Sequence, residues 1–214
     1  MFPNQEHLFH MIKVLSALSK AVLLLSCAAF ISCKEKTNGD HIINARLGDI
    51  TLPNKEAEND FNKGLFYVRQ ENYSAAKDFF LRADEESPNT PIILNALGNC
   101  SDRTGKVLEG FKYFKKALQI DGNYIWTYIN YGCSLNNDHQ FNEAEMIFRQ
   151  GLTRRSPPSF ERSVLYLNLA DTYYHRDQPD TALSLLDSAK MGLKDQKTYS
   201  AILKFEDQIK RRPY

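Results

Sequence analysis

The sequence predicts an all-α fold, a right-handed solenoid of about four stacked helix-turn-helix units that is closed by a further helix at the C-terminus. Three observations predict it. Residue types recur with a period of 34 positions, apolar residues within a period follow helical spacing, and turn-forming residues separate the periods. Because one helix pair cannot bury both of its faces, consecutive pairs are expected to stack against one another.

The composition is that of an ordinary globular chain. Of the 214 residues, 43% are hydrophobic and 25% are charged, which excludes a multi-span membrane protein, a collagen-like chain and a wholly disordered one. The chain has 27 lysines and arginines against 26 acidic residues, so it carries no electrostatic footprint for nucleic acid. Its four cysteines are too few for a disulfide scaffold.

An uncharged apolar stretch, AVLLLSCAAFISC, lies between Lys20 and Lys34, and the chain becomes polar directly after it. The stretch is too short to span a bilayer as a permanent helix. With Ser32 before Cys33, it resembles a bacterial lipoprotein signal peptide and its lipobox. The resemblance implies cleavage before Cys33 and fatty acylation of that cysteine, with chains such as palmitate. It predicts a signal peptide over residues 1–32 and a lipidated N-terminus and tether over 33–56.

Two alternatives remain open for this segment. Cys27 also follows a lipobox-like sequence, although cleavage there would leave a short apolar region. The segment would otherwise be a plain secretory peptide or an uncleaved anchor, and translation could start at Met1 or Met11. The lipoprotein resemblance places the protein in a bacterial cell envelope. Lys34, which is not the aspartate of inner-membrane retention, favours the outer membrane over the inner one.

The 34-residue period joins several classes of residue in one register. A fourth copy follows after a four-residue insertion around Pro157, with Ala170, Ala182, Leu186 and Ala189 at the corresponding positions. The residues that share a position in the first three copies are Gly64, Gly98 and Gly132; Phe80, Phe114 and Phe148; Ala83, Ala117 and Gly151; and the turn residues Pro88, Gly122 and Ser156.

This pattern resembles the tetratricopeptide repeat, a helix-turn-helix unit of 34 residues, from about Ala57 to Lys194. The resemblance places the four repeats at residues 57–90, 91–124, 125–158 and 163–196, with a capping helix at 197–214. Three residues depart from the family pattern and suggest local softness of the stack. They are Lys63 at an apolar position, Ser101 at an aromatic one and Gly110 at an alanine one.

Local signals support the helix boundaries. Thr90 and Pro91 form an N-cap followed by proline at the first helical position, and Pro179 marks another helix start. Gly105 can end a helix in the left-handed conformation. The segment 197–211 places its apolar residues on one side, as a helix that solvates the open end of a solenoid would.

The sequence contains no motif for catalysis or for a metal. His41, His139 and His175 show none of the spacings of a metal or catalytic site, and no phosphate-binding loop or nucleophile motif occurs. We therefore expect no enzyme activity, cofactor or metal. A disulfide between Cys100 and Cys133 stays open, because the first helices of consecutive repeats are expected to be neighbours.

The resemblance implies a peptide-binding groove lined by the first helices. Asparagine is frequent there, and its amide can both donate to and accept from an extended backbone. Trp126 would be an aromatic anchor, although it could instead pack locally, and Asn130 and Asn168 could instead bind neighbouring helices. The groove residues are Asn95, Asn99, Arg103, Trp126, Ile129, Asn130, Asn137, Asn168, Asp171 and His175.

One subclass of the family is disfavoured. Members that bind chaperone tails grip a C-terminal carboxylate with cations, but Asn95, Val164 and Asn168 occupy those positions here. We therefore expect a membrane-anchored, non-enzymatic scaffold that binds a protein or peptide segment in an envelope complex. The alternative is a self-associating structural protein whose groove is filled by a neighbouring chain. The sequence names neither the partner nor the oligomeric state.

Overall fold

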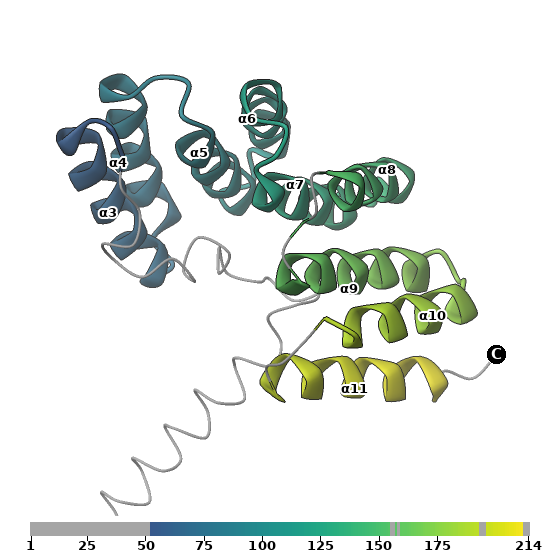
Figure 1. The fold of residues 1–214 in the computed structure, drawn as a ribbon. Coiled ribbons are helices and arrows are strands. Elements are labelled where there is room, and N and C mark those ends of the chain that lie inside the picture. The colour runs from purple at the N-terminus through teal and green to yellow at the C-terminus, as the bar shows by residue number, and fades with distance from the viewer. Residues whose placement is uncertain (1–51, 155–156, 158, 193–195, 212–214) are drawn as a thin grey trace, which may run out of the picture.

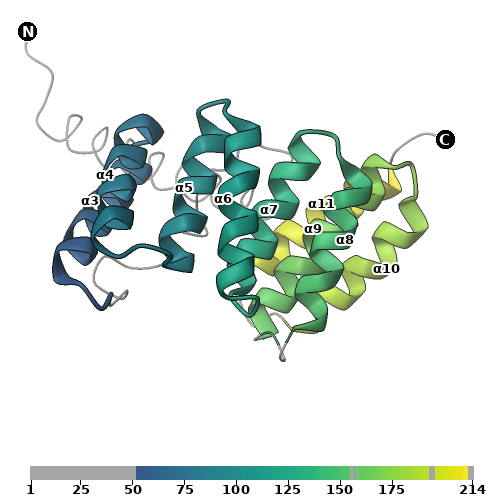
Figure 2. The same ribbon diagram turned by 90° about the horizontal axis from the view of Figure 1, so that it is seen from above.

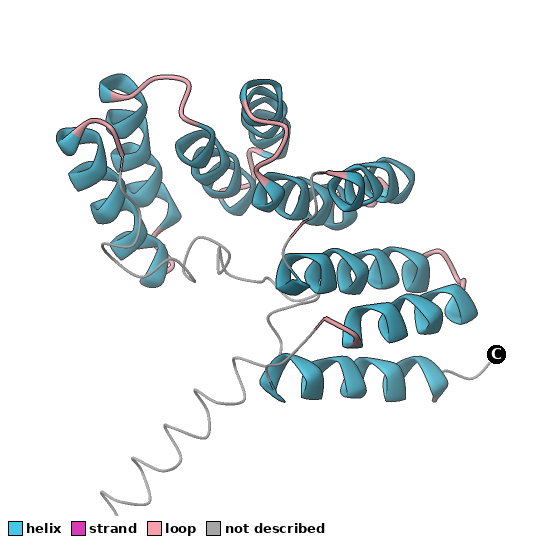
Figure 3. Cartoon of the chain, in the orientation of Figure 1, coloured by secondary structure: helices cyan, strands magenta, loops and turns pink. Residues whose placement is uncertain are grey.

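The computed structural model describes residues 52–154, 157, 159–192 and 196–211, so the predicted signal peptide, Cys27, Cys33 and nearly all of the tether lie outside it. Within the described ranges the regular structure is helical, which confirms the predicted fold class (Figures 1 and 3). The helices are α3 (Lys55–Arg69), α4 (Tyr73–Glu86), α5 (Pro91–Arg103), α6 (Val107–Ile120), α7 (Ile125–Asn137), α8 (Phe141–Thr153), α9 (Ser159–His175), α10 (Pro179–Lys190) and α11 (Gln196–Lys210).

The helices form an arc of antiparallel pairs. Each odd-numbered helix from α3 to α9 packs against the helix that follows it, and α11 packs on α10 (Figures 1 and 2). In Figure 1, α5, α7 and α9 lie on the inner side of the arc, whereas α6, α8 and α10 lie on the outer side. Among the described residues, no helix is long and apolar enough to cross a bilayer.

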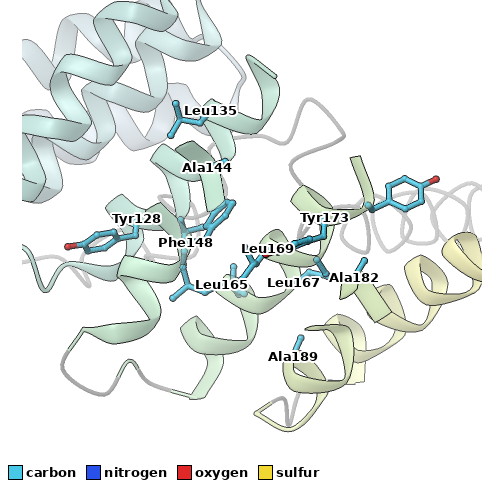
Figure 4. Close-up of a cluster of buried hydrophobic side chains, with 14 of the residues drawn as sticks. Tyr128, Leu135, Ala144, Phe148, Leu165, Leu167, Leu169, Tyr173, Ala182 and Ala189 are labelled. Carbon is cyan, nitrogen blue, oxygen red and sulfur yellow. The ribbon is translucent and has the colours of Figure 1, made fainter. Parts of the chain in front are cut away.

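A glycine in each of the first three first helices makes room for a phenylalanine of the second helix. A Cβ added to Gly132 would lie 2.3 Å from the Phe148 ring, and Gly64 and Gly98 stand in the same relation to Phe80 and Phe114. Phe148 is fully buried in the main core cluster (Figure 4). The fourth repeat has Ala170 and Leu186 at these two positions, both fully buried. A larger residue on one helix is thus matched by a smaller one on the other.

The turn within each repeat contains one residue with a left-handed backbone. These residues are Glu71, Gly105, His139 and Asp177, with φ between 55° and 80°. The next residue donates its backbone N–H back to the helix, as Lys106 does to the Ser101 carbonyl at 2.8 Å. This closes the helix end in the manner of a Schellman motif. The prediction for Gly105 is confirmed, whereas the other three turns adopt the conformation without glycine.

Helix starts follow the predicted signals with one difference. Pro91 and Pro179 begin α5 and α10. Asn54 caps α3, because its Oδ1 accepts from the backbone nitrogens of Glu56 at 2.8 Å and Ala57 at 3.3 Å. Thr90 occupies the N-cap position of α5, but its hydroxyl donates to the Ser87 carbonyl at 2.8 Å and does not cap the helix.

Two of the three departures from the family pattern, Lys63 and Gly110, have structural reasons. Lys63 belongs to the first repeat, which has no helix pair before it among the described residues, and it forms an ion pair with Asp60 at 2.9 Å. The equivalent residues Leu97 and Tyr131 are buried against the preceding repeat. Gly110 is closely packed, since an added Cβ would lie 2.9 Å from the Gly98 carbonyl oxygen. Ser101 is fully buried.

Helix α9 begins earlier than the predicted fourth repeat. It starts at Ser159, so the inserted residues add about one helical turn before position 163. A polar cluster fixes α9 against α8. Glu145 accepts from Arg149 on its own helix, and its carboxylate lies 2.5 Å from both the Tyr173 hydroxyl and the Arg176 guanidinium. Arg149 also donates to Tyr173 at 2.9 Å.

The N-terminal boundary of the described chain is packed on the first repeat. Leu52 is buried with Ala57 and Phe61 in the core cluster of α3, α4 and α5. Its backbone N–H donates to Glu58 Oε2 at 3.0 Å. A second cluster extends from α6 to α11, whereas Ala117 of α6 belongs to the first cluster. Helix α6 therefore contributes residues to both clusters.

Candidate peptide-binding surface

The inner face, which we define as the side of the arc formed by α5, α7 and α9, holds the ten residues predicted to bind a peptide. These helices are neighbours, since α7 contacts both α5 and α9. They come together because the alternating helix pairs stack, so each first helix lies beside the first helix of the next repeat. Residues about 35 positions apart in the sequence therefore meet in space.

Buried amides connect these helices. Asn130 Nδ2 on α7 donates to Asn95 Oδ1 on α5 at 3.1 Å, and both side chains are buried. Asn136 Nδ2 on α7 donates to Thr172 Oγ1 on α9 at 3.0 Å. Because a buried polar group without a partner is costly, these bonds favour one register of the first helices over others. We call these two contacts the polar ladder.

Asn168 on α9 is also buried and continues this polar layer. Its Nδ2 donates to the Val164 carbonyl at 2.8 Å, and its Oδ1 lies 3.3 Å from Cys133 Sγ. Cys100 is a free, buried thiol, so the disulfide between Cys100 and Cys133 does not form. Burial raises the pKa of Cys100 to about 12, so this thiol is not in the reactive thiolate form at neutral pH.

A histidine and a carboxylate lie near the C-terminal end of α9. His175 Nε2 is 3.7 Å from Asp171 Oδ1, and the Asp171 side chain is almost fully buried. The His175 ring stacks on Phe141 of α8, with centroids 5.6 Å apart and planes 5° from parallel. The exposed edge of His175 therefore offers a nitrogen donor or acceptor on a fixed aromatic platform.

The single tryptophan is half-buried and packs against the main core cluster. Its ring lies 6.4 Å from that of Phe160, which the early start of α9 brings beside it. Neighbouring Ile129 is fully buried. Trp126 and Phe160 together form an aromatic pair with exposed surface at one end of the inner face.

The remaining predicted residues differ in their surroundings. Asn99 is half-buried and Asn137 is exposed. The Arg103 guanidinium lies over the Tyr73 ring of the first repeat, 4.9 Å from its centroid. Arg103 therefore contacts α4 as well as facing solvent. Beside it, burial raises the pKa of Asp102, because the charged form is poorly solvated there.

Three further residues of this surface were not predicted as site residues. Phe141, Phe160 and Tyr73 supply the aromatic surfaces beside His175, Trp126 and Arg103. Phe141 and Tyr73 occupy the same repeat position at the start of a second helix. The nearness of this position to the end of the first helix was a usable signal. Within the described residues, no cluster of three potential metal ligands occurs.

Comparisons with known proteins agree with this architecture. A family model for the tetratricopeptide repeat matches residues 61–90. No curated protein matches the chain.

Several solved structures share the fold. A structure of pilF from Pseudomonas aeruginosa has a TM-score of 0.61 at 19% identity, over 72% of this chain and 71% of that one. YrrB, described as a tetratricopeptide repeat protein with an unusual peptide-binding site, has a TM-score of 0.57 at 22% identity, over 71% and 74%. MamA from Desulfovibrio magneticus has a TM-score of 0.54 at 15% identity, over 73% and 96%. The chain therefore has the fold of tetratricopeptide repeat proteins.

Proposed function

We propose that this chain is a non-enzymatic scaffold that binds an extended protein segment along its inner face. The observation that carries the proposal is the juxtaposition on α5, α7 and α9 of an aromatic pair, a histidine platform and surface asparagines above a fixed polar layer. Asn99 and Asn137 can bond a peptide backbone, while Trp126 and Phe160 can bury an apolar side chain. YrrB, a structure of similar fold, is described as having a peptide-binding site, which supports this class of ligand.

The polar ladder favours binding without a large rearrangement. Asn95, Asn130 and Asn136 hold adjacent helices through hydrogen bonds of 3.0 to 3.1 Å between side chains. A surface that is already ordered loses less conformational entropy when a ligand arrives, so more of the contact energy appears as affinity. The inner face would thus act as a preformed platform.

We further propose that the protein is anchored to a bacterial envelope membrane, the outer membrane in preference to the inner, by lipid on Cys33. Support comes from the apolar segment that ends at Ser32 and Cys33 and from the abrupt polar sequence after it. Several acyl chains on one residue give stable anchoring, since each buried methylene contributes about 0.8 kcal/mol. The overall charge is near neutral, so lipid and not a general electrostatic attraction would hold the protein at the membrane.

The binding proposal is tested by crosslinking in intact envelopes, followed by affinity measurements with the captured protein. The double variant Trp126→Ala/Asn99→Ala should lose affinity about tenfold or more while keeping its helicity, because aromatic anchors dominate interface energy. Lys204→Ala, on an exposed position of α11, is the matched surface control. Unchanged affinity of the double variant would move the interaction away from the inner face.

The anchor is tested by metabolic labelling with palmitate and fractionation of the membranes. Cys33→Ser should remove the label and the membrane retention, whereas Cys27→Ser should leave both intact. The opposite pattern would assign lipidation to Cys27. Light scattering on the protein extracted in detergent measures its oligomeric state and so tests the self-associating alternative. A monomer would count against that alternative, because its inner face would be open for another protein.

A further inference from the structure

The second helices of the pairs differ sharply in charge. Helix α6 carries three lysines and one glutamate, whereas α4 has two basic and four acidic residues. Helices α8 and α10 each carry one basic residue and two acidic ones. Of these four second helices, α6 is therefore the one with a positive net charge. A solvated helix face needs charge of either sign, so solubility does not explain this difference.

The lysines of α6 are concentrated on its solvent side. Lys112 and Lys115 follow Leu108 by four and seven residues, so they form a line along one face, and Lys116 lies beside it. All three lysines are exposed. The opposite side of the helix carries Phe114 and Ala117 in the core. The outer face of α6, defined as Leu108, Lys112, Lys115, Lys116 and Ile120, is thus a continuous surface.

These charges are not neutralised by the rest of the described chain. Lys112, Lys115 and Lys116 make no ion pair with any described residue, and the one acidic residue of α6, Glu109, binds Lys77 at 2.7 Å. On α8, by contrast, Arg149 is held by Glu145 at 2.8 Å. Three adjacent uncompensated cations repel one another, and an anionic partner would relieve that repulsion.

Apolar side chains lie at both ends of the lysine row. Leu108 is 71% exposed and Ile120 is 43% exposed. They are twelve positions apart in the sequence, which corresponds to about 18 Å along a helix axis. An extended segment covers that distance with about five or six residues. The surface is therefore complementary to a short acidic run with an apolar residue at each end.

We propose that the outer face of α6 is a second docking surface, which takes an acidic protein segment flanked by apolar residues. A narrow segment fits better than a flat anionic membrane. The second helices of the neighbouring repeats, α4 and α8, expose carboxylates that anionic lipid would repel, including Asp78 and Glu85 on α4 and Glu143 on α8. The surface faces away from α5, α7 and α9, so the chain can hold a second partner independently of its inner face.

The test uses the full chain in detergent micelles and two fluorescent synthetic peptides. In the first peptide a run of glutamates lies between two leucines, and in the second lysines replace the glutamates. We expect the first to bind, with affinity falling as salt rises. Lys115→Glu should weaken binding about tenfold, because it exchanges an attraction for a repulsion. Leu108→Ser should weaken it severalfold. Lys204→Glu, an equal charge change on an exposed site of α11, should leave it unchanged.

Three outcomes would overturn the proposal. One is equal binding of the two peptides, and another is an equal loss of affinity for Lys204→Glu and Lys115→Glu. The third concerns lipid, tested with phosphatidylcholine vesicles that contain or lack phosphatidylglycerol. If phosphatidylglycerol increases the bound protein, Lys115→Glu removes that increase, and the acidic peptide does not bind, the outer face of α6 binds lipid and not protein. None of these results depends on the inner face, so they leave the proposal for that surface standing.

Discussion

Replacing Gly132 by alanine tests the size matching on which the helix pairs depend. The added Cβ would lie 2.3, 2.5 and 2.7 Å from three atoms of the Phe148 ring, closer than real carbon contacts allow. Phe148 is fully buried, so its ring cannot turn into solvent. Either the ring or the α7–α8 distance must therefore change.

Two opposing effects set the magnitude. Overpacking of a core typically costs about 1 to 3 kcal/mol, whereas alanine is favoured over glycine inside a helix by about 1 kcal/mol. We expect Gly132→Ala to lower the free energy of unfolding by about 1 kcal/mol, since the clash exceeds the propensity gain. Phe148→Leu alone should also lower it, because a cavity opens beside the glycine.

The double variant Gly132→Ala/Phe148→Leu reproduces the pair that the fourth repeat has at Ala170 and Leu186. It should be more stable than the sum of the single effects predicts, by about 1 kcal/mol, because the new methyl group fills space vacated by the ring. Urea unfolding followed by circular dichroism measures all three variants. Gly122→Ala is the control, since its Cβ would meet nothing nearer than 3.6 Å. Strict additivity of the two single changes would refute the proposed matching.

Two further predictions concern the polar cluster and the turns. Although burial opposes it, hydrogen bonds from Tyr173 and two arginines hold the pKa of Glu145 below its ordinary value of 4.5. The stabilisation that the ionised Glu145 provides is present above pH 4.5, and it is lost as the pH falls through the lowered pKa of Glu145 in the folded state. Glu145→Gln should therefore reduce stability at neutral pH, and the difference from wild type should shrink in acid unfolding curves below about pH 4.5; a constant difference would contradict it. Both His139 and Gly105 have positive φ, which glycine adopts more readily than other residues. His139→Gly should therefore raise the thermal midpoint and Gly105→Ala should lower it, and each should change the free energy of unfolding by up to about 1 kcal/mol. If both variants shifted the midpoint in the same direction, the left-handed backbone would not explain the effect.

The period of the sequence predicts the helix pairs because it records a packing requirement. Gly132 and Phe148 appear in it as two separate classes, and their contact follows only when α7 and α8 are placed side by side. Lys63 shows the limit of the family comparison. Its charge looked like a weak point, but no helix pair precedes this repeat within the described residues, and the exposed Lys63 pairs there with Asp60. A period describes interior repeats and says little about the first one.

The site residues were predicted less completely than the fold. Repeat position identified the helices of the inner face, but it could not separate an amide that bonds a neighbouring helix from one that faces solvent. Asn130 and Asn137 are both asparagines of α7, yet one is buried against Asn95 and the other is exposed. Phe160 was missed because the fourth repeat was predicted to begin at position 163, whereas α9 begins at Ser159.

Asn130 therefore offers a way to separate positioning from contact on the inner face. Asn130→Ala removes the donor to Asn95 Oδ1 and leaves a buried acceptor unsatisfied, which should cost about 1 to 3 kcal/mol in the free energy of unfolding. Removing both amides should cost less than the sum of the single changes, because no unpaired acceptor then remains. Asn137→Ala is the matched control on the same helix and should change stability by less than about 0.5 kcal/mol.

Affinity for a captured partner then distinguishes the two roles. If Asn130 acts by holding α5 against α7, its replacement should weaken binding in proportion to the stability lost, and the double variant should recover part of both. If Asn130 touches the ligand, removing Asn95 as well cannot restore affinity, because the missing amide is the contact itself. Recovery of stability without recovery of binding would therefore contradict the positioning role that the hydrogen bond between Asn130 and Asn95 indicates.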